Sequence, residues 1–320
     1  MLKEFQEAIE EEIKSLAFHS PKELYEPIHY IMQLGGKRLR PLLCLLSYNL
    51  FGKQWEKILK PAVALEIFHN FTLMHDDIMD NAPLRRGKQT IHKKWNSNVG
   101  ILSGDVMLVK AYEHLITAES RYLLKVLNSF NKCATQVCEG QQMDMNFESQ
   151  PAVSEENYLS MIEKKTAALL GFSMELGGIL GNQNESVLQK LYNYGCNLGM
   201  AFQLKDDLLD VYGDEQFGKQ PGGDIISNKK TFLLIKATEL ASGNDKEALL
   251  YWLSQQEFDS DEKIREIKAI YTRLKIREEV EIRINDYFDL AKKNLLDAGL
   301  EKDAGELLFS FTENLKSRKK

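Results

Sequence analysis

A chain of 320 residues with a formal net charge of −6 lacks the excess positive charge of a general nucleic-acid-binding protein. Its length allows two domains or one large one, and its hydrophobic content of 43% is ordinary for a globular protein. It contains only seven prolines, and none lies between 84 and 150, between 152 and 220, or after 222. These long proline-free stretches are rich in Leu, Glu, Lys and Ala and therefore predict helices.

The predicted helices follow one another along the chain with few interruptions. The chain opens with an acidic amphipathic helix rather than a secretory signal. Ser20-Pro21-Lys22-Glu23 fits an N-cap, a proline at N1 and the Glu of a capping box, which predicts a helix to about Leu34. A second helix follows Pro41. Further helices are expected at about 61–79, 98–120, 121–147, 155–180, 185–212, 229–241, 244–255, 260–275, 277–296 and 301–315.

Two interruptions stand out among these helices. Pro83 and Gly87 mark a loop, and no alternating strand pattern or Asn-Gly or Asp-Gly hairpin signal occurs. The longest stretch without helical character is 213–228, which carries Gly218, Gly222 and Gly223. No segment has the composition of an interdomain linker. We therefore predict a single helical domain over residues 1–320, with one functional loop at 213–228.

The cysteines and the hydropathy pattern bear on the compartment. Four cysteines, at 44, 133, 138 and 196, lie in apolar helical surroundings without metal or redox spacing. They predict buried, reduced thiols and a reducing compartment. No apolar stretch is long and uncharged enough to span a bilayer, and the basic ending Lys316-Ser317-Arg318-Lys319-Lys320 is interpreted as a solvated tail. We expect a cytoplasmic protein without stable membrane insertion.

One carboxylate pattern occurs twice, as Asp76-Asp77-Ile78-Met79-Asp80 and as Asp206-Asp207-Leu208-Leu209-Asp210. Each copy ends an apolar, helix-period run, and positions i and i+4 of a helix share a face. Repelling carboxylates at this spacing favour a cation between them, and Mg²⁺ takes oxygen ligands that it usually shares with a phosphate. Solvated acidic helix ends are the alternative, which two identical clusters make less convincing than one would.

Cations in glycine-containing loops accompany both acid motifs. Gly35-Gly36-Lys37-Arg38-Leu39-Arg40-Pro41 combines three cations with a helix start, which suits a phosphate group. Arg85-Arg86-Gly87 follows the first acid motif, and Lys219 and Lys229-Lys230-Thr231 follow the second. Acids that hold metal and cations that hold phosphate, repeated in this way, indicate a substrate with more than one phosphate.

Together with His69, Gly140-Gln141, Lys165-Thr166 and Gln203, these motifs resemble those of the trans-isoprenyl diphosphate synthases of the polyprenyl synthetase family. The resemblance covers nearly the whole chain. It implies an all-α fold of ten or more helices around a deep cavity, a homodimer and Mg²⁺, with three ions expected. The implied reaction is head-to-tail condensation of isopentenyl diphosphate with an allylic diphosphate, by ionisation, condensation and proton loss.

The resemblance also implies a role for each motif residue. The metal ligands would be Asp76, Asp80 and Asp206, while the residues that act through water or orient them would be Asp77, Asp207 and Asp210. Isopentenyl diphosphate would be bound by Lys37, Arg40, His69 and Arg86. The allylic diphosphate would be bound by Arg85, Lys165, Lys219 and Lys229. Polar groups near the carbocation would be Thr166 and Gln203, with support from Gln141 and Asp144.

Product length in this family is set largely by bulk just before the first acid motif. Phe71 lies five residues and Thr72 four residues before Asp76. A large ring at Phe71 would form a floor under a short chain, which implies a fifteen- or twenty-carbon product, with geranylgeranyl diphosphate favoured. Ideal helix geometry places Phe71 well off the Asp76 face, so an ordinary core phenylalanine is the alternative.

Other functions compete with this interpretation. A class I terpene cyclase or head-to-head synthase also uses Asp motifs and Mg²⁺, but the set Lys37, Arg40 and His69 indicates a second diphosphate site. A non-catalytic partner subunit would be expected to lose part of an acid motif, and both are intact. A longer-chain polyprenyl diphosphate synthase also remains open.

Overall fold

The computed structural model describes residues 1–16, 20–213, 222–300 and 302–317. Helices make up most of this part of the chain, so the predicted all-α fold of ten or more helices is confirmed. The elements in chain order are α1 (Leu2–Ser15), α2 (Lys22–Gln33), α3 (Leu39–Asn49), the 3₁₀-helix η1 (Trp55–Ile58), α4 (Leu59–Met79), β1 (Leu84–Arg85), β2 (Lys88–Gln89), α5 (Ile91–Lys94), α6 (Ser97–Leu115), α7 (Ser120–Glu148), α8 (Glu155–Ile162), the π-helical turn η2 (Glu163–Ala167), α9 (Ala168–Leu180), α10 (Glu185–Tyr212), α11 (Gly223–Ile226), α12 (Phe232–Leu240), α13 (Gly243–Ser254), α14 (Ser260–Arg273), α15 (Ile276–Asp297) and α16 (Lys302–Ser317).

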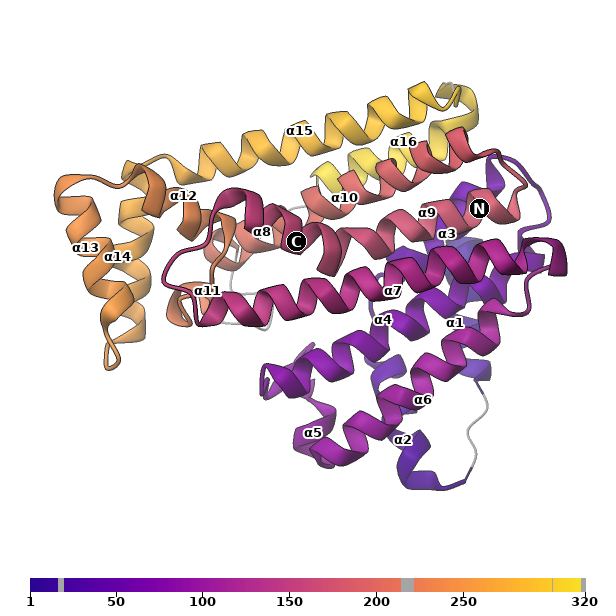
Figure 1. Cartoon of the computed structure of the whole chain (residues 1–320), viewed down its shortest axis with the longest axis horizontal. Coiled ribbons are helices and arrows are strands. Elements are labelled where there is room, and N and C mark those ends of the chain that lie inside the picture. Colours follow the sequence, from indigo (N-terminus) through magenta and orange to yellow (C-terminus); the bar gives the residue numbers. More distant parts are fainter. Residues whose placement is uncertain (17–19, 214–221, 301, 318–320) are drawn as a thin grey trace.

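The long helices lie side by side along the longest axis of the molecule (Figure 1). α10 packs along α9 and α15, α9 also packs against α3, and α4 packs against α3 and α6. α7 runs along α9 and η2. The α13–α14 hairpin projects from one end of the bundle, next to α11 and α12. The C-terminal ends of α4 and α10 point toward this same end, which brings the two acid motifs to one region of the molecule.

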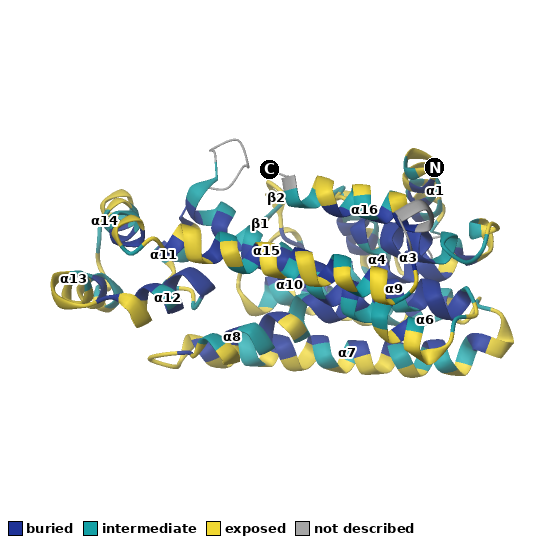
Figure 2. Cartoon of the chain, turned by 90° about the horizontal axis from the view of Figure 1, so that it is seen from above, coloured by how far each residue is buried: buried dark blue, intermediate teal, exposed yellow. Residues whose placement is uncertain are grey.

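Aromatic rings join the central helices. Phe130 of α7 contacts Phe68 of α4 and Phe172 of α9, with ring centroids 5.1 and 5.8 Å apart. Each of the three side chains is at most 1% exposed. Burying a ring of this size stabilises the fold by about 2–3 kcal/mol, and the edge contacts add to it. Figure 2 shows the buried residues along the inner faces of the long helices, with exposed residues on their outer faces.

α4 and α10 agree with the predicted helices 61–79 and 185–212 to within two residues. Residues 62–68 of α4 are each at most 2% exposed. A helix that is apolar on all sides is buried. α4 therefore runs through the core and carries the first acid motif at its C-terminal end. The N-cap of α10 is Asn184, whose side chain accepts a hydrogen bond from the Val187 N–H.

Several predicted elements differ from the structure in detail. The helix expected at 155–180 is interrupted by the π-turn η2, which a periodicity pattern does not reveal. The stretch 213–228 contains the short helix α11. The N-cap of α2 is Pro21 rather than Ser20, and no side chain caps that helix, so the predicted capping box was wrong.

The loop predicted around Pro83 and Gly87 is a small antiparallel hairpin in which Leu84 pairs with Gln89. Arg86 and Gly87 form its turn, and both have positive φ, at 52° and 73°. A two-residue hairpin turn requires this geometry. The sequence signal was missed because arginine, rather than asparagine or aspartate, precedes the glycine.

The cysteines divide into two classes. Cys44, Cys133 and Cys196 are buried free thiols, as predicted, but Cys138 is exposed on α7. The expectation of four buried thiols was therefore wrong for Cys138. No helix in the described ranges combines the length and the apolar character needed to cross a bilayer.

Candidate active site

The first acid motif lies at the C-terminal end of α4. Asp77, 2% exposed, accepts hydrogen bonds from the Arg85 guanidinium at 2.7–2.8 Å, so hairpin β1–β2 is joined to α4. The side-chain carboxylates of Asp76 and Asp80 form no hydrogen bond or ion pair with other described residues. Burial raises the pKa of Asp76 to about 6, Lys165 opposes this shift, and the Asp80 carboxylate adds to it. Two crowded carboxylates therefore remain available for a ligand.

The second acid motif lies near the C-terminal end of α10 and has more protein partners. Asp207 is buried and accepts hydrogen bonds from the Tyr158 hydroxyl and, at 3.0 Å, from Gln203 Nε2. The Gln203 Oε1 atom in turn accepts from the Thr166 hydroxyl at 3.0 Å. Burial raises the pKa of Asp207 to about 7. The predicted residues Thr166, Gln203 and Asp207 therefore belong to one hydrogen-bonded chain that ends at Tyr158.

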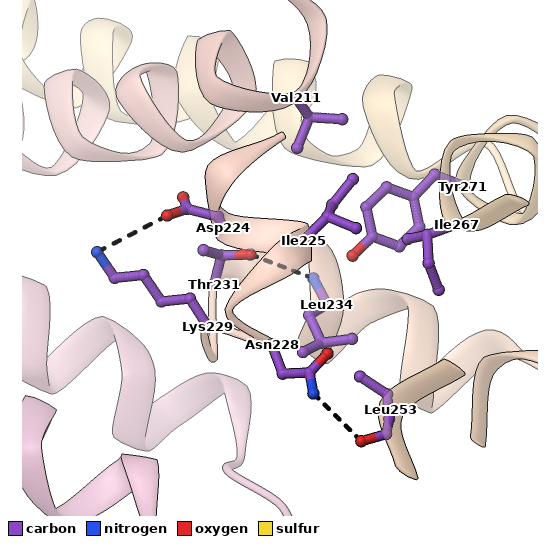
Figure 3. Close-up of a pocket in the computed structure, with 10 residues that line it drawn as sticks. All are labelled: Val211, Asp224, Ile225, Asn228, Lys229, Thr231, Leu234, Leu253, Ile267 and Tyr271. Carbon is purple, nitrogen blue, oxygen red and sulfur yellow. Dashed lines mark hydrogen bonds and ion pairs between the residues drawn. The ribbon is translucent and has the colours of Figure 1, made fainter. Parts of the chain in front are cut away.

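Asp210 joins the second motif to α11, because its Oδ2 atom accepts a hydrogen bond of 2.9 Å from the Asp224 N–H. Asp206, one helical turn before it, is half-buried on α10. Asp224 also lies 4.0 Å from the Lys229 ammonium group (Figure 3). α11 thus links the second acid motif to one of the predicted phosphate-binding cations.

Lys229 is influenced by both acid motifs. Half of its side chain is accessible to water, and desolvation by the surrounding protein would lower its pKa. The carboxylates of Asp224, Asp144, Asp207 and Asp80 overcome that effect and raise it. Asp80 comes from the first motif and Asp207 from the second, so carboxylates of both motifs affect the same ammonium group. Their negative charge keeps Lys229 protonated.

Lys165 and Thr166 lie on the π-turn η2. A Cβ at Gly140 of α7 would lie 2.3 Å from the Lys165 backbone nitrogen, so only glycine allows this approach. Lys165 Nζ lies 2.6 Å from the Oδ2 atom of Asp144, which, like Gly140, is on α7. Gln141, adjacent to Gly140, is buried, and its Oε1 atom has no hydrogen-bond partner in the part of the chain that the structure describes. A π-turn at a close helix contact is frequent at functional sites.

A second group of cations surrounds His69 on α4. Burial and the charges of Arg40, Arg86 and Arg85 hold the pKa of His69 well below its usual range, so the ring is neutral near pH 7. Burial lowers the pKa of Arg40 to about 10, and its Nε atom is buried without a described partner. Arg86 donates a hydrogen bond to the Gly35 carbonyl. A cationic side chain whose buried N–H donor lacks a hydrogen-bond partner suits an anionic ligand.

The three cations of the Gly35–Pro41 run separate in the structure. Arg38 has positive φ, at 47°, and is only 4% exposed. Its guanidinium donates to Glu10 at 2.8 Å, to Glu66 at 3.0 Å and to the Met32 carbonyl at 2.7 Å. Arg38 therefore holds α1, α2 and α4 together, and the interpretation of all three cations as a phosphate site was too broad.

The structure also places the remaining predicted residues. Lys37 is exposed at the start of the run before α3, and Lys219 lies outside the described residues. Phe71 is half-buried, with its ring 5.5 Å from Phe68 and 4.8 Å from His75. The Thr72 hydroxyl donates to the His69 carbonyl at 2.8 Å, within its own helix.

Two site residues escaped sequence reasoning. Tyr158, on α8, donates a hydrogen bond to Asp207, which lies 49 residues later in the chain. The sequence around Tyr158 contains no pattern that predicts this contact. Asp224 follows Gly222-Gly223 in the loop after the second acid motif, and this juxtaposition of glycines, acid and a nearby lysine was a usable signal.

No three His, Cys, Asp or Glu side chains converge on one point within the described ranges. The predicted ligands Asp76, Asp80 and Asp206 are therefore not a preassembled metal cage. Mg²⁺ is usually held by one or two carboxylates together with substrate phosphates. Asp76 and Asp80, spaced by one helical turn and without bonded protein partners among the described residues, supply that kind of donor set. The residues fit Mg²⁺ that is shared with a diphosphate.

Comparison with known proteins gives matches over most of the chain. The model of the family described as polyprenyl synthetase matches residues 21–271. The geranylgeranyl diphosphate synthase of Saccharolobus solfataricus is 39% identical over 299 residues, which cover 92% of this chain and 90% of that protein. The geranylfarnesyl diphosphate synthase of Natronomonas pharaonis is 32% identical, with coverages of 98% and 94%. A crystal structure of a geranylgeranyl pyrophosphate synthase has a TM-score of 0.95 at 41% identity, covering 100% of this chain and 99% of that chain.

Proposed function

Because the chain belongs to the polyprenyl synthetase family and is a prenyltransferase, we propose that it condenses isopentenyl diphosphate head-to-tail with an allylic diphosphate. The observation that carries this proposal is the position of Lys229, which carboxylates of both acid motifs influence. A separate cationic group around His69 supplies a second diphosphate region. Two such regions suit a condensation of two diphosphates better than a cyclisation of one.

In the allylic region, Asp76, Asp80 and Asp206 would hold Mg²⁺, which neutralises charge on the departing diphosphate when bound. Three ions are expected by resemblance to the family. Lys165 and Lys229 add fixed positive charge beside the same carboxylates. Tyr158, Gln203 and Arg85 restrain the carboxylates that do not face the ligand. The departing group thus meets positive charge that is already in place.

Thr166 and Gln203 would face the allylic cation. The Thr166 hydroxyl hydrogen is donated to Gln203, so the oxygen lone pairs remain available to a developing positive charge. In the isopentenyl region, Lys37, Arg40 and Arg86 would bind the diphosphate, and neutral His69 can donate one hydrogen bond to it. The proton lost after condensation would pass to the released diphosphate.

The product is proposed to have fifteen or twenty carbons, with geranylgeranyl diphosphate favoured. Phe71 supports this assignment, because its ring is anchored against Phe68 and His75 on the helix that leads to the first acid motif. Similarity alone leaves the length open, since the relatives include both a geranylgeranyl and a geranylfarnesyl diphosphate synthase.

One incubation tests the reaction and its product. Purified protein, Mg²⁺, isopentenyl diphosphate and labelled allylic starters of several lengths should give prenyl diphosphates of defined length. Hydrocarbon products would instead indicate a cyclase. Failure to incorporate isopentenyl units with any starter would reject the proposed condensation.

We also propose that the whole chain acts as one domain in a cytoplasmic homodimer. One hydrophobic core links the helices from α1 to α16, and the cysteines are free. The outer face of α6 carries exposed Ile101, Leu102 and Val109, an apolar surface of the kind that a second copy covers. Leu102→Glu should convert the dimer into a monomer, and light scattering after gel filtration measures this; an unchanged mass would argue against this interface.

A further inference from the structure

Lys263 of α14 is a cation in an unusual place. Its residue is 0% exposed, and its Nζ atom donates to Asn228 Oδ1 at 2.7 Å and to the Ile226 carbonyl at 3.3 Å. It also lies 4.0 Å from the Phe258 ring centroid. It forms no ion pair with a carboxylate of the described residues. Burying a charge without a counter-ion costs free energy, and these contacts offset part of that cost while they join α14 to a neighbouring segment.

That segment is the turn between α11 and α12. Asn228 has positive φ, at 53°, and its Nδ2 atom donates to the Leu253 carbonyl at 3.2 Å (Figure 3). Its side chain thus binds both helices of the α13–α14 hairpin, Leu253 on α13 and Lys263 on α14. The two hydrogen bonds of the Asn228 side chain fasten the turn to the projecting hairpin, and the Lys263 contact with the Ile226 carbonyl adds to them.

Lys229 follows directly in the chain. Its N–H donates to the Asp224 carbonyl at 2.9 Å, and its carbonyl accepts from the Thr231 N–H at 2.8 Å. Behind this turn lies a small cavity lined largely by apolar side chains, among them Ile225, Leu253 and Ile267. The hydrogen bonds of Asn228 with Lys263 and Leu253 add to the backbone hydrogen bonds that fix this turn.

We infer that Lys263 and Asn228 are positioning residues that aim Lys229 at the allylic diphosphate. This inference rests on the proposed function, in which Lys229 binds that diphosphate. Lys263 touches no substrate; it acts through Asn228 and the backbone of the turn. Displacing the backbone of Lys229 would lengthen its charge-assisted contacts with a diphosphate, which are strongest at short distances.

The test replaces Lys263 by Met, which keeps an unbranched apolar stem and removes the donors. We expect the KM for the allylic diphosphate to rise about tenfold, with the KM for isopentenyl diphosphate changed less than twofold. Binding of an unreactive allylic thiodiphosphate with Mg²⁺, measured by calorimetry, should weaken by the same factor. Asn228→Gly, which retains the positive φ, should reproduce the effect and serves as the test if Lys263→Met does not fold.

The controls separate positioning from general damage. Lys246→Met, at an exposed site of the same hairpin, should leave both KM values unchanged. In a Lys229→Ala background, Lys263→Met should add no further loss of allylic affinity, because the residue it positions is gone. Multiplicative losses would overturn the inference, as would unchanged allylic affinity in both the Lys263 and Asn228 variants.

Different outcomes would reject the proposed function and the positioning role. A wild-type protein that condenses no starter rejects that function before any variant is compared. A wild-type protein that is active, beside folded variants with normal allylic affinity, rejects only the positioning role.

Discussion

The two acid motifs have the same spacing but different surroundings. In the first, only the carboxylate of Asp77 is bound by protein, through Arg85, while the carboxylates of Asp76 and Asp80 have no hydrogen-bond or ion-pair partner among the described residues. In the second, Asp207 is held by Tyr158 and Gln203, and Asp210 is held by the backbone of α11. The first motif therefore offers carboxylates to a ligand, whereas much of the second is built into the protein framework. Equal sequence patterns need not have equal roles.

The largest expected effect tests this difference directly. Asp76→Asn should lower kcat about 10³-fold or more, equivalent to about 4 kcal/mol of transition-state stabilisation, because a ligand carboxylate is lost. Asp207→Asn should lower kcat far less, because the amide oxygen can still accept from Tyr158, although the amide nitrogen cannot accept from Gln203. Initial rates of isopentenyl incorporation at saturating substrate measure both. Equal losses in the two variants would show that the motifs do not differ in role.

The second prediction concerns the pH dependence of stability. Burial raises the pKa of Asp207 to about 7, well above the ordinary value of 3.8 for an aspartate carboxyl. The folded state therefore binds this proton more tightly than the unfolded state, and stability falls as pH rises from about 4 to about 7. The difference corresponds to roughly 4 kcal/mol of unfolding free energy.

Asp207→Asn removes the titrating group, so the variant should gain stability relative to the wild type between pH 4 and pH 8. Urea unfolding at both pH values, without Mg²⁺, measures the gain. Asp210→Asn, at the half-buried position on the same helix, is the matched comparison. A constant difference between the wild type and Asp207→Asn across this range would show that Asp207 is not the buried acid that the structure indicates.

A smaller effect is expected at the contact that places Lys165 beside the first motif. Gly140→Ala would put a Cβ 2.3 Å from the Lys165 nitrogen, so α7 and the π-turn must separate. We expect a loss of about 1–3 kcal/mol in unfolding free energy and a higher KM for the allylic diphosphate. Thr135→Ala, at an exposed position on α7, should be neutral. Full stability and normal kinetics in Gly140→Ala would contradict the close-contact explanation.

The sequence predicted well what depends on local pattern. The helical runs before both acid motifs follow from periodicity. The family resemblance placed Thr166 and Gln203 near one reacting group, but their hydrogen bond to each other is known only from the structure. The sequence does not reveal which cation of the Gly35–Pro41 run has a buried side chain. Arg38 does so because its backbone is left-handed and because Glu10 and Glu66, 28 residues away on either side, converge on it. Such contacts depend on tertiary packing.

The π-turn and the β1–β2 hairpin were missed for a related reason. A π-turn shifts helical phase by a single residue, too little for a periodicity pattern to register around Lys165. The hairpin turn uses Arg86, whose guanidinium is engaged by the Gly35 carbonyl. Arg86 has a positive φ, which arginine rarely adopts. Its contact partner Gly35 lies 51 residues away in the chain, so the local sequence does not predict this turn.

The last prediction concerns the length of the product rather than the rate of the reaction. Phe71→Ala removes a ring that contacts Phe68 and His75, so if this ring is the floor beneath the chain, the product should lengthen by at least one isoprene unit. Chromatography of the dephosphorylated products measures this. Thr72→Ala should have less influence, since its hydroxyl is bonded to its own helix. An unchanged product from Phe71→Ala would mean that the ring serves only the core, and that the first motif's helix does not set chain length through this residue.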